Sequence, residues 1–121
     1  MSMIWKNLIT REQVADIIEE SQDHPVIILK HSTICSLSFV AKDRLERDWD
    51  EHEMDNIQSY LLDIISNRDI SNYLAEIFGI PHQSPQLLLI HRGECIYDTS
   101  HLAISYRELW KQISDLRALR S

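Results

Sequence analysis

The segment that decides the fold is PVIILKHSTICSLSFVAKDRLERD, Pro25 to Asp48. It opens with a short apolar run rich in β-branched residues, which is typical of a strand covered on both faces. Polar residues follow the run, and apolar residues then recur at helical spacing from Ser36 onward. The segment therefore predicts a strand, a polar loop and a helix, with Cys35 at the point where the helix begins. The residues expected on the apolar side of this helix are Leu37, Val40, Ala41 and Leu45.

Helix and strand patterns alternate on both sides of this segment. A helix is predicted before it, over residues 10–21, with Thr10 as the N-cap. After it, the sequence predicts a strand over residues 57–65 and a helix over residues 67–79. Gly79 is a natural left-handed end for that helix.

The last third of the chain follows a different pattern. Residues 85–90 and 94–99 predict two strands, and the tight turn at Arg92-Gly93 joins them in an antiparallel hairpin. Residues 105–121 predict a final amphipathic helix, with Ser105 as its cap. The whole order predicts a single α/β domain over residues 1–121, with a four-stranded mixed sheet flanked by helices.

Composition and charge exclude several classes of function. The chain has 121 residues, of which 44% are hydrophobic, and its 12 basic and 19 acidic residues give a net charge of −7. This acidic balance argues against a nucleic-acid partner. The longest apolar runs, VIIL and LLLI, are far too short to span a membrane, and no leader pattern is present at the N-terminus. We expect a soluble cytoplasmic protein, and two widely separated cysteines fit a reducing compartment.

Three stretches carry a family resemblance: KHSTICSLS (30–38), GIPHQSPQLLLIHRG (79–93) and YDTSH (97–101). They resemble the YtxJ-type monothiol bacilliredoxins, redox proteins of the bacillithiol system in the thioredoxin-like superfamily. The resemblance implies a thioredoxin-like fold, a nucleophile at Cys35 and bacillithiol as a thiol co-substrate, with no tightly bound cofactor. The chain departs from the family pattern at two positions. Ile34 stands where a basic residue is usual, and Ser36 where proline is usual.

Cys35 is the expected nucleophile because of its place in the chain. A thiol attacks a disulfide only as the thiolate, and the unpaired amides and macrodipole at a helix N-terminus favour that anion. Lys30 and His31 are close in sequence, and the hydroxyls of Ser36 and Ser38 are possible donors to the sulfur. The alternative is a buried structural thiol. The polar neighbours of Cys35 favour the reactive interpretation.

Ser38 indicates a monothiol mechanism. In a dithiol site a second cysteine three residues after the first resolves the mixed disulfide, and a serine cannot. An external thiol must then release Cys35. The hairpin places Cys95 about five strand residues, or roughly 16 Å, from the edge of the sheet where Cys35 is expected. We therefore interpret Cys95 as structural.

The substrate groove is expected beside Pro85, which by resemblance follows a cis peptide bond. The backbone of Ser84 would then pair with an extended substrate chain. The alternative is a proline that only starts an edge strand. The segment from Thr99 to His101 is expected to bind anionic bacillithiol or, alternatively, to cap the last helix, and His82 is close enough to Pro85 to line the groove. The substrate-binding candidates are His31, Ser84, Pro85, Thr99, Ser100 and His101.

The leading hypothesis is a monothiol thiol-disulfide oxidoreductase that removes bacillithiol from S-bacillithiolated protein cysteines. Its partners would be those proteins and a low-molecular-weight thiol, and the chain would be a monomer or weak dimer. A redox-inactive binding module of the same fold and an iron–sulfur cluster carrier are the alternatives. The charged stretch over residues 43–55 has no convincing metal-ligand spacing, so no metal site is expected.

Overall fold

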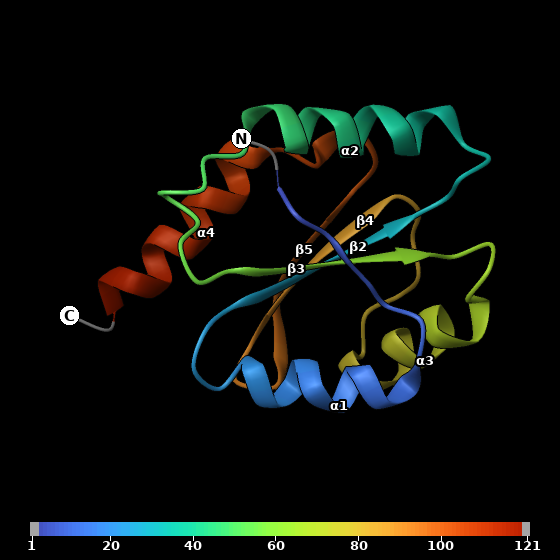
Figure 1. The fold of residues 1–121 in the computed structure, drawn as a ribbon, viewed down its shortest axis with the longest axis horizontal. Coiled ribbons are helices and arrows are strands. Elements are labelled where there is room, and N and C mark those ends of the chain that lie inside the picture. The colour runs from blue at the N-terminus through green and yellow to red at the C-terminus, as the bar shows by residue number, and fades with distance from the viewer. Residues whose placement is uncertain (1–2, 120–121) are drawn as a thin grey trace.

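The computed structural model describes residues 3–119. These residues form one sheet in the order β1-β3-β2-β4-β5, with helices on both faces (Figure 1). The strands are β1 (Lys6–Asn7), β2 (Val26–His31), β3 (Gln58–Asp63), β4 (Gln86–His91) and β5 (Glu94–Ser100). The helices are α1 (Arg11–Glu20), α2 (Ser36–Asp48), α3 (Arg68–Phe78), the short 3-10 helix η1 (His101–Ala103) and α4 (Tyr106–Leu119).

β2 is the middle strand, and all its residues are buried. It pairs in parallel with β3 and antiparallel with β4. In the antiparallel pairing Val26 lies opposite Ile90 and Lys30 lies opposite Gln86. The end of β2 therefore meets the start of β4, so the loop after β2 and the loop before β4 lie at the same edge of the sheet.

Different helices cover the two faces of the sheet. Figure 1 shows α2 and α4 on one face and α1 and α3 on the other. The side chains of β2 alternate between the two cores: Ile27 and Leu29 pack on the side of α2 and α4, and Val26 and Ile28 on the side of α1 and α3. Because strand side chains alternate, the last two residues of β2, Lys30 and His31, point to opposite faces.

Several local predictions are confirmed. Thr10 caps α1 in a capping box with Gln13, and Gly79 ends α3 in the left-handed conformation with φ of 66°. The hairpin turn uses positive φ angles at both Arg92 and Gly93, as a tight turn between twisted strands requires. Ser105 accepts a hydrogen bond from the Glu108 amide and so caps α4. The last two residues of the predicted final helix lie outside the described residues.

The sheet has one strand more than predicted. β1 is two exposed residues long, and it forms by pairing Lys6 with Tyr60 and Asn7 with Leu61 on β3. So short a strand has no periodicity of its own, and only the neighbouring strand defines it. The strand predicted over residues 57–65 is shorter at both ends in the structure, where β3 runs from Gln58 to Asp63.

Val40 was predicted on the buried side of α2, and this is wrong. The buried residues of α2 are Ser38, Ala41 and Leu45, and Val40 is 48% exposed. A polar residue, Ser38, takes one of the inward positions. The spacing of apolar residues alone therefore predicted the wrong buried face for this helix. None of the helices within residues 3–119 is long and apolar enough to cross a membrane.

We expect Leu29→Ala to lower the free energy of unfolding by about 2–5 kcal/mol, because it opens a cavity in the middle of the sheet. Leu29 is fully buried, whereas Ile4 is 75% exposed. Ile4→Ala is therefore the control and should change stability by less than about 0.5 kcal/mol. Urea unfolding followed by circular dichroism measures both, and equal effects of the two variants would contradict this account of the core.

Candidate active site around Cys35

Cys35 is the N-cap residue of α2, with extended backbone angles. Its side chain is partly exposed, and it makes no capping hydrogen bond. The Cys35 amide donates to the Ser32 carbonyl at 3.3 Å, and the Ser38 amide donates to the Cys35 carbonyl at 3.1 Å. The sulfur therefore lies at the positive end of a 13-residue helix, which favours an anion there.

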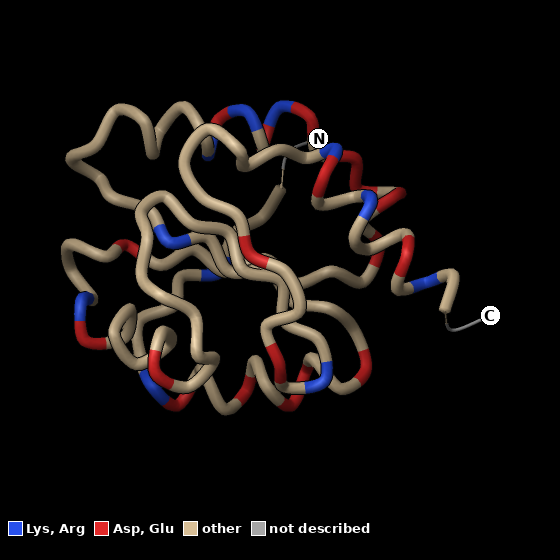
Figure 2. Tube along the Cα trace, turned by 180° about the vertical axis from the view of Figure 1, so that it is seen from behind, with Lys and Arg blue, Asp and Glu red and all other residues tan. Residues whose placement is uncertain are grey.

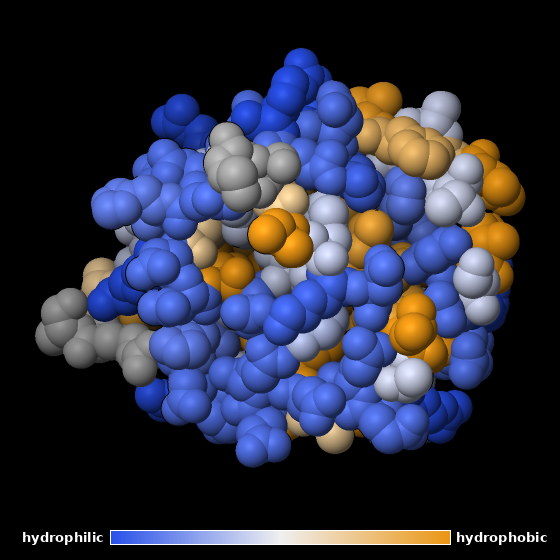
Figure 3. Space-filling view, in the orientation of Figure 1, coloured by the Kyte–Doolittle hydropathy of each residue, from blue (hydrophilic) through white to orange (hydrophobic). Residues whose placement is uncertain are grey.

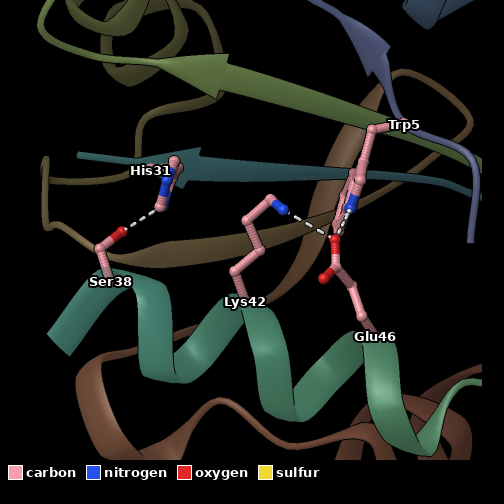
Figure 4. A network of polar contacts seen from close by, with 5 residues as sticks. All are labelled: Trp5, His31, Ser38, Lys42 and Glu46. Atoms are coloured by element: carbon pink, nitrogen blue, oxygen red, sulfur yellow. Dashed lines mark hydrogen bonds and ion pairs between the residues drawn. The ribbon is translucent and has the colours of Figure 1, made fainter. Parts of the chain in front are cut away.

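Ser38 holds the loop that carries Cys35. It is fully buried, and its hydroxyl oxygen accepts a hydrogen bond from the Ser32 amide at 3.0 Å. The same oxygen lies 2.6 Å from Nδ1 of His31 (Figure 4). The sequence left Ser38 as one of two possible donors to the sulfur of Cys35. Instead its hydroxyl hydrogen-bonds to the strand and the loop beneath the helix.

His31 is buried beneath the first turns of α2. It is 3% exposed, and its ring meets Phe39 edge to face with 4.7 Å between ring centres. Burial, and then the positive charge of Lys42, lower the pKa of His31; Asp63 acts in the opposite direction. The imidazole is therefore favoured in its neutral form, as a partner for the Ser38 hydroxyl rather than as a charge next to the thiol.

A second polar group lies under α2 near His31. The Glu46 carboxylate accepts from Nζ of Lys42 at 2.8 Å and from Nε1 of Trp5 at 2.7 Å (Figure 4). Burial by itself raises the pKa of Glu46, but the two hydrogen bonds outweigh it and lower the pKa. Glu46 is thus held as a carboxylate, and the Lys42 charge that acts on His31 is partly balanced.

The loop before β4 brings Pro85 to the same edge. The Ser84–Pro85 peptide bond is cis, as the resemblance implies. Pro85 is buried and directly precedes Gln86, which pairs with Lys30. Pro85 is therefore alongside the end of β2, where the loop to Cys35 begins. The hydroxyl oxygen of Ser84 is buried and has no hydrogen-bond partner among the described residues.

Gln86 was not predicted as a site residue, yet it fixes the shape of this loop. It is fully buried, its Nε2 donates to the Pro81 carbonyl at 3.1 Å, and its Oε1 accepts from the Gln83 amide at 3.2 Å. Its Nε2 also lies 3.4 Å from the Asp98 carboxylate. A glutamine directly after Pro85 was the only signal in the sequence, and it is equally typical of an ordinary strand residue.

The segment from Thr99 to His101 lies beside Pro85. Thr99 pairs with Leu87 and Ser100 with Gln86 in the ladder between β4 and β5. The His101 amide donates to the Pro85 carbonyl at 3.0 Å, and the His101 side chain is exposed. Since Ser105 caps α4, this segment is not the cap of the last helix.

Lys30 does not lie with Cys35 on the α2 side. Its Nζ donates to the Ser71 carbonyl of α3 at 3.3 Å and lies 3.4 Å from Nδ1 of His82. Lys30 is 1% exposed, and burial lowers its pKa to about 8. Lys30 was considered as a positive charge that could stabilise the Cys35 thiolate. It does not do so by direct contact, because the pleat of β2 turns its side chain to the opposite face.

Cys95 lies far along the hairpin from this edge. It pairs with Ile90, whereas Ser100 pairs with Gln86 next to Pro85. Its side chain packs against the core of α1 and α3, and its thiol donates to the Tyr97 carbonyl at 3.4 Å. Burial raises the pKa of the Cys95 thiol to about 11. Both cysteines are free thiols.

Comparison with known proteins gives the family. The model of the family described as monothiol bacilliredoxin BrxC matches residues 6–109. The chain belongs to this family. A solved structure described as a candidate oxidoreductase with a thioredoxin fold is 30% identical, covers 89% of this chain and 91% of its own, and has a TM-score of 0.76.

Two solved thioredoxins are similar in fold at much lower identity. The protein from Trypanosoma brucei brucei is 14% identical, with 95% of this chain and 92% of that chain covered and a TM-score of 0.74. The protein from Malassezia sympodialis is 15% identical, with 93% and 90% covered and a TM-score of 0.72. The fold is a thioredoxin fold, and family and fold together support a function of the thiol-disulfide oxidoreductase type.

The surface near Cys35 is apolar and uncharged. Residues 31–41 contain no Lys, Arg, Asp or Glu, and the start of α2 is accordingly free of charge colours at the upper left of Figure 2. Apolar atoms gather at the same end of the molecule, at the upper right of Figure 3. The exposed apolar residues of this region are Ile34, Phe39, Val40 and Leu102, which are 81%, 50%, 48% and 66% exposed.

Within residues 3–119 no group of three or more His, Cys, Asp or Glu is placed to hold a metal ion.

We expect Ser38→Ala to lower the free energy of unfolding by about 1–3 kcal/mol, because the Ser32 amide and Nδ1 of His31 would be left buried without a partner. Ser36→Ala is the matched control, since Ser36 is exposed on the same turn of α2. Urea unfolding measures both. A Ser38→Ala variant as stable as Ser36→Ala would mean that the serine does not hold the loop.

We expect Lys30→Met to differ from the wild-type protein in a pH-dependent way. Burial lowers the pKa of Lys30 in the folded protein from its ordinary value of 10.5 to about 8. Between these values the unfolded chain binds more protons, so wild-type stability rises with pH relative to the variant. The free energy of unfolding of the wild-type protein, relative to that of Lys30→Met, should therefore rise by about 3 kcal/mol between pH 7 and pH 10.5.

Lys111→Met is the control for this measurement, because Lys111 is exposed on α4. Urea unfolding at a series of pH values gives the two differences. If Lys30→Met and Lys111→Met follow the same pH dependence, the ammonium group of Lys30 is not held in a costly buried environment.

Proposed function

We propose that this protein removes bacillithiol from S-bacillithiolated protein cysteines through a mixed disulfide on Cys35. One observation carries the proposal. The partly exposed thiol of Cys35 lies at the N-terminus of α2, and the position three residues later holds a buried serine whose hydroxyl is already hydrogen-bonded. Such a site can form a mixed disulfide but has no neighbouring thiol to resolve it.

The reaction has two exchange steps. The Cys35 thiolate attacks the bacillithiol sulfur of the substrate disulfide, a new S–S bond forms on Cys35, and the protein thiolate leaves and takes a proton from water. A second bacillithiol thiolate then attacks the sulfur that Cys35 holds. This step releases bacillithiol disulfide and regenerates the Cys35 thiolate, so electrons pass from the external thiol to the substrate protein.

The substrate would lie between α2 and the loop that contains Pro85. The backbone of Ser84 would pair with an extended substrate chain, and the Ser84 hydroxyl, which is buried without a partner among the described residues, would gain a hydrogen bond there. Thr99, Ser100 and His101 stand beside Pro85 and would face the anionic thiol. His31 would act indirectly, by holding Ser38 and the loop of Cys35.

A second candidate is a redox-inactive binding module with the same groove. The observation in its favour is the exposed apolar surface next to Cys35, above all Ile34, which is 81% exposed where the family usually has a basic residue. Such a surface suits the docking of another protein whether or not the thiol reacts.

The test is transfer of bacillithiol from a bacillithiolated model protein to the reduced chain, followed by mass spectrometry. We expect the adduct on Cys35, release of the model protein and no transfer to Cys35→Ser. Cys95→Ser is the matched control and should react within about twofold of the wild-type protein, because Cys95 lies at the other end of the hairpin.

Absence of transfer to the wild-type protein between pH 6 and pH 9 would overturn the proposed reaction and favour the binding module. Loss of turnover in Cys95→Ser, with adduct accumulating on Cys35, would instead contradict the monothiol mechanism.

A further inference from the structure

Three polar groups meet under the loop that contains Pro85, on the face of the sheet away from α2. Nδ1 of His82 lies 3.4 Å from Nζ of Lys30 and 3.1 Å from the hydroxyl oxygen of Ser71. Lys30 is buried, Ser71 is buried, and His82 is exposed. His82 thus contacts the buried lysine from an exposed position, three residues before Pro85.

The chemistry of this contact favours one tautomer of His82. An ammonium group only donates hydrogen bonds, so the proximity of Lys30 favours Nδ1 of His82 as an acceptor. A neutral imidazole that accepts at Nδ1 carries its proton on Nε2. Burial, and then the positive charges of Lys30 and Arg68, lower the pKa of His82, so the neutral ring is favoured. His82 therefore points an Nε2–H donor outward.

The charges around this donor favour an anion as its partner. Within residues 3–119 neither of the two ion pairs involves Lys30, and the Asp98 carboxylate on the same side lies by the Gln86 amide. The other titratable groups that act on the pair are Arg68 and the Cys95 thiol, which is neutral at pH 7 because its pKa is raised. Lys30 and Arg68 therefore make the surroundings of His82 locally positive on a chain whose net charge is −7, and such surroundings favour an anionic ligand.

We propose that Nε2–H of His82 binds a carboxylate of the low-molecular-weight thiol that Cys35 holds in its mixed disulfide, and that Lys30 and Ser71 are positioning residues that set the tautomer and direction of His82. This inference rests on the proposed function, because it assigns a contact to the small thiol of the same reaction. It makes His82 a specificity residue that separates thiols with a carboxylate from neutral ones.

The first experiment measures how well Cys35 retains different thiols, without any protein substrate. The wild-type chain is equilibrated with the reduced and disulfide forms of bacillithiol, of glutathione, which also carries carboxylates, and of neutral 2-mercaptoethanol. Mass spectrometry gives the fraction of Cys35 adduct. We expect His82→Phe to weaken the bacillithiol and glutathione adducts roughly tenfold and to leave the 2-mercaptoethanol adduct unchanged, as the loss of a charge-assisted hydrogen bond predicts.

His82→Gln is the matched variant, because its side-chain amide keeps an N–H donor, and it should retain most of the preference. Equal adduct formation by wild type and His82→Phe with all three thiols would overturn the proposal. A uniform loss across the three thiols would overturn it as well, since that outcome indicates a structural role of the ring.

The second experiment reads the tautomer directly from the ¹⁵N chemical shifts of the His82 ring at pH 7. The wild-type protein should show a neutral ring protonated at Nε2, and Lys30→Met should shift the population toward Nδ1–H. A wild-type ring that is protonated at Nδ1, alone or together with Nε2, would overturn the assignment.

The failure of this inference is distinguishable from the failure of the proposed function. A His82-dependent preference for carboxylate thiols, in a protein that releases nothing from bacillithiolated substrates, refutes the proposed reaction and supports the contact. Release of bacillithiol that His82→Phe leaves unchanged refutes the contact and supports the reaction.

Discussion

Complete burial of β2 is the constraint on which the site depends. Its first four residues are apolar, but its last two are Lys30 and His31, and both are buried with them. A buried polar group is tolerated only if it finds hydrogen-bond partners, and a buried charge costs more still. The pleat turns the two side chains to opposite faces, so each must find its partners in a different layer of the molecule. These partners support the loop that carries Cys35 and the loop that contains Pro85.

On the α2 side, His31 hydrogen-bonds to the Ser38 hydroxyl, whose oxygen also accepts from the Ser32 amide. This arrangement ties the loop carrying Cys35 to the strand beneath it and offers an explanation for a serine at the position where dithiol relatives of the fold place a second cysteine. The chain also lacks the proline that usually follows the nucleophile in its family. A hydrogen-bonded serine one turn into α2 supplies a different restraint on the same loop, through side-chain contacts rather than a rigid ring.

On the α3 side, Lys30 finds Ser71 and His82, and the adjacent strand supplies Gln86, whose amide holds the loop from Pro81 to Gln83. Neighbouring residues of one strand thus support the loop of Cys35 and the loop of Pro85. Because Lys30 is opposite Gln86 in the sheet, the spacing between the two loops is set by strand register. A shift of the register by one residue would turn the side chains of Lys30 and His31 to the opposite faces, and the two loops would lose these contacts. The proposed chemistry therefore depends on the packing of the core.

The sequence by itself determined the order of the α-helices and strands from Thr10 onward, the position of Cys35 at the start of α2 and the hairpin turn, because each depends on residues adjacent in the chain. It did not determine β1, whose two residues become a strand only by pairing with β3. It left open where the side chains of Ser38 and Lys30 point: Ser38 hydrogen-bonds to His31 and the Ser32 amide, and Lys30 lies on the face away from α2, because the direction of a side chain depends on the layer that covers it. The contact between Lys30 and His82 joins residues 52 positions apart. Only the tertiary structure decided it, because a buried ammonium takes whichever acceptor the fold brings within reach.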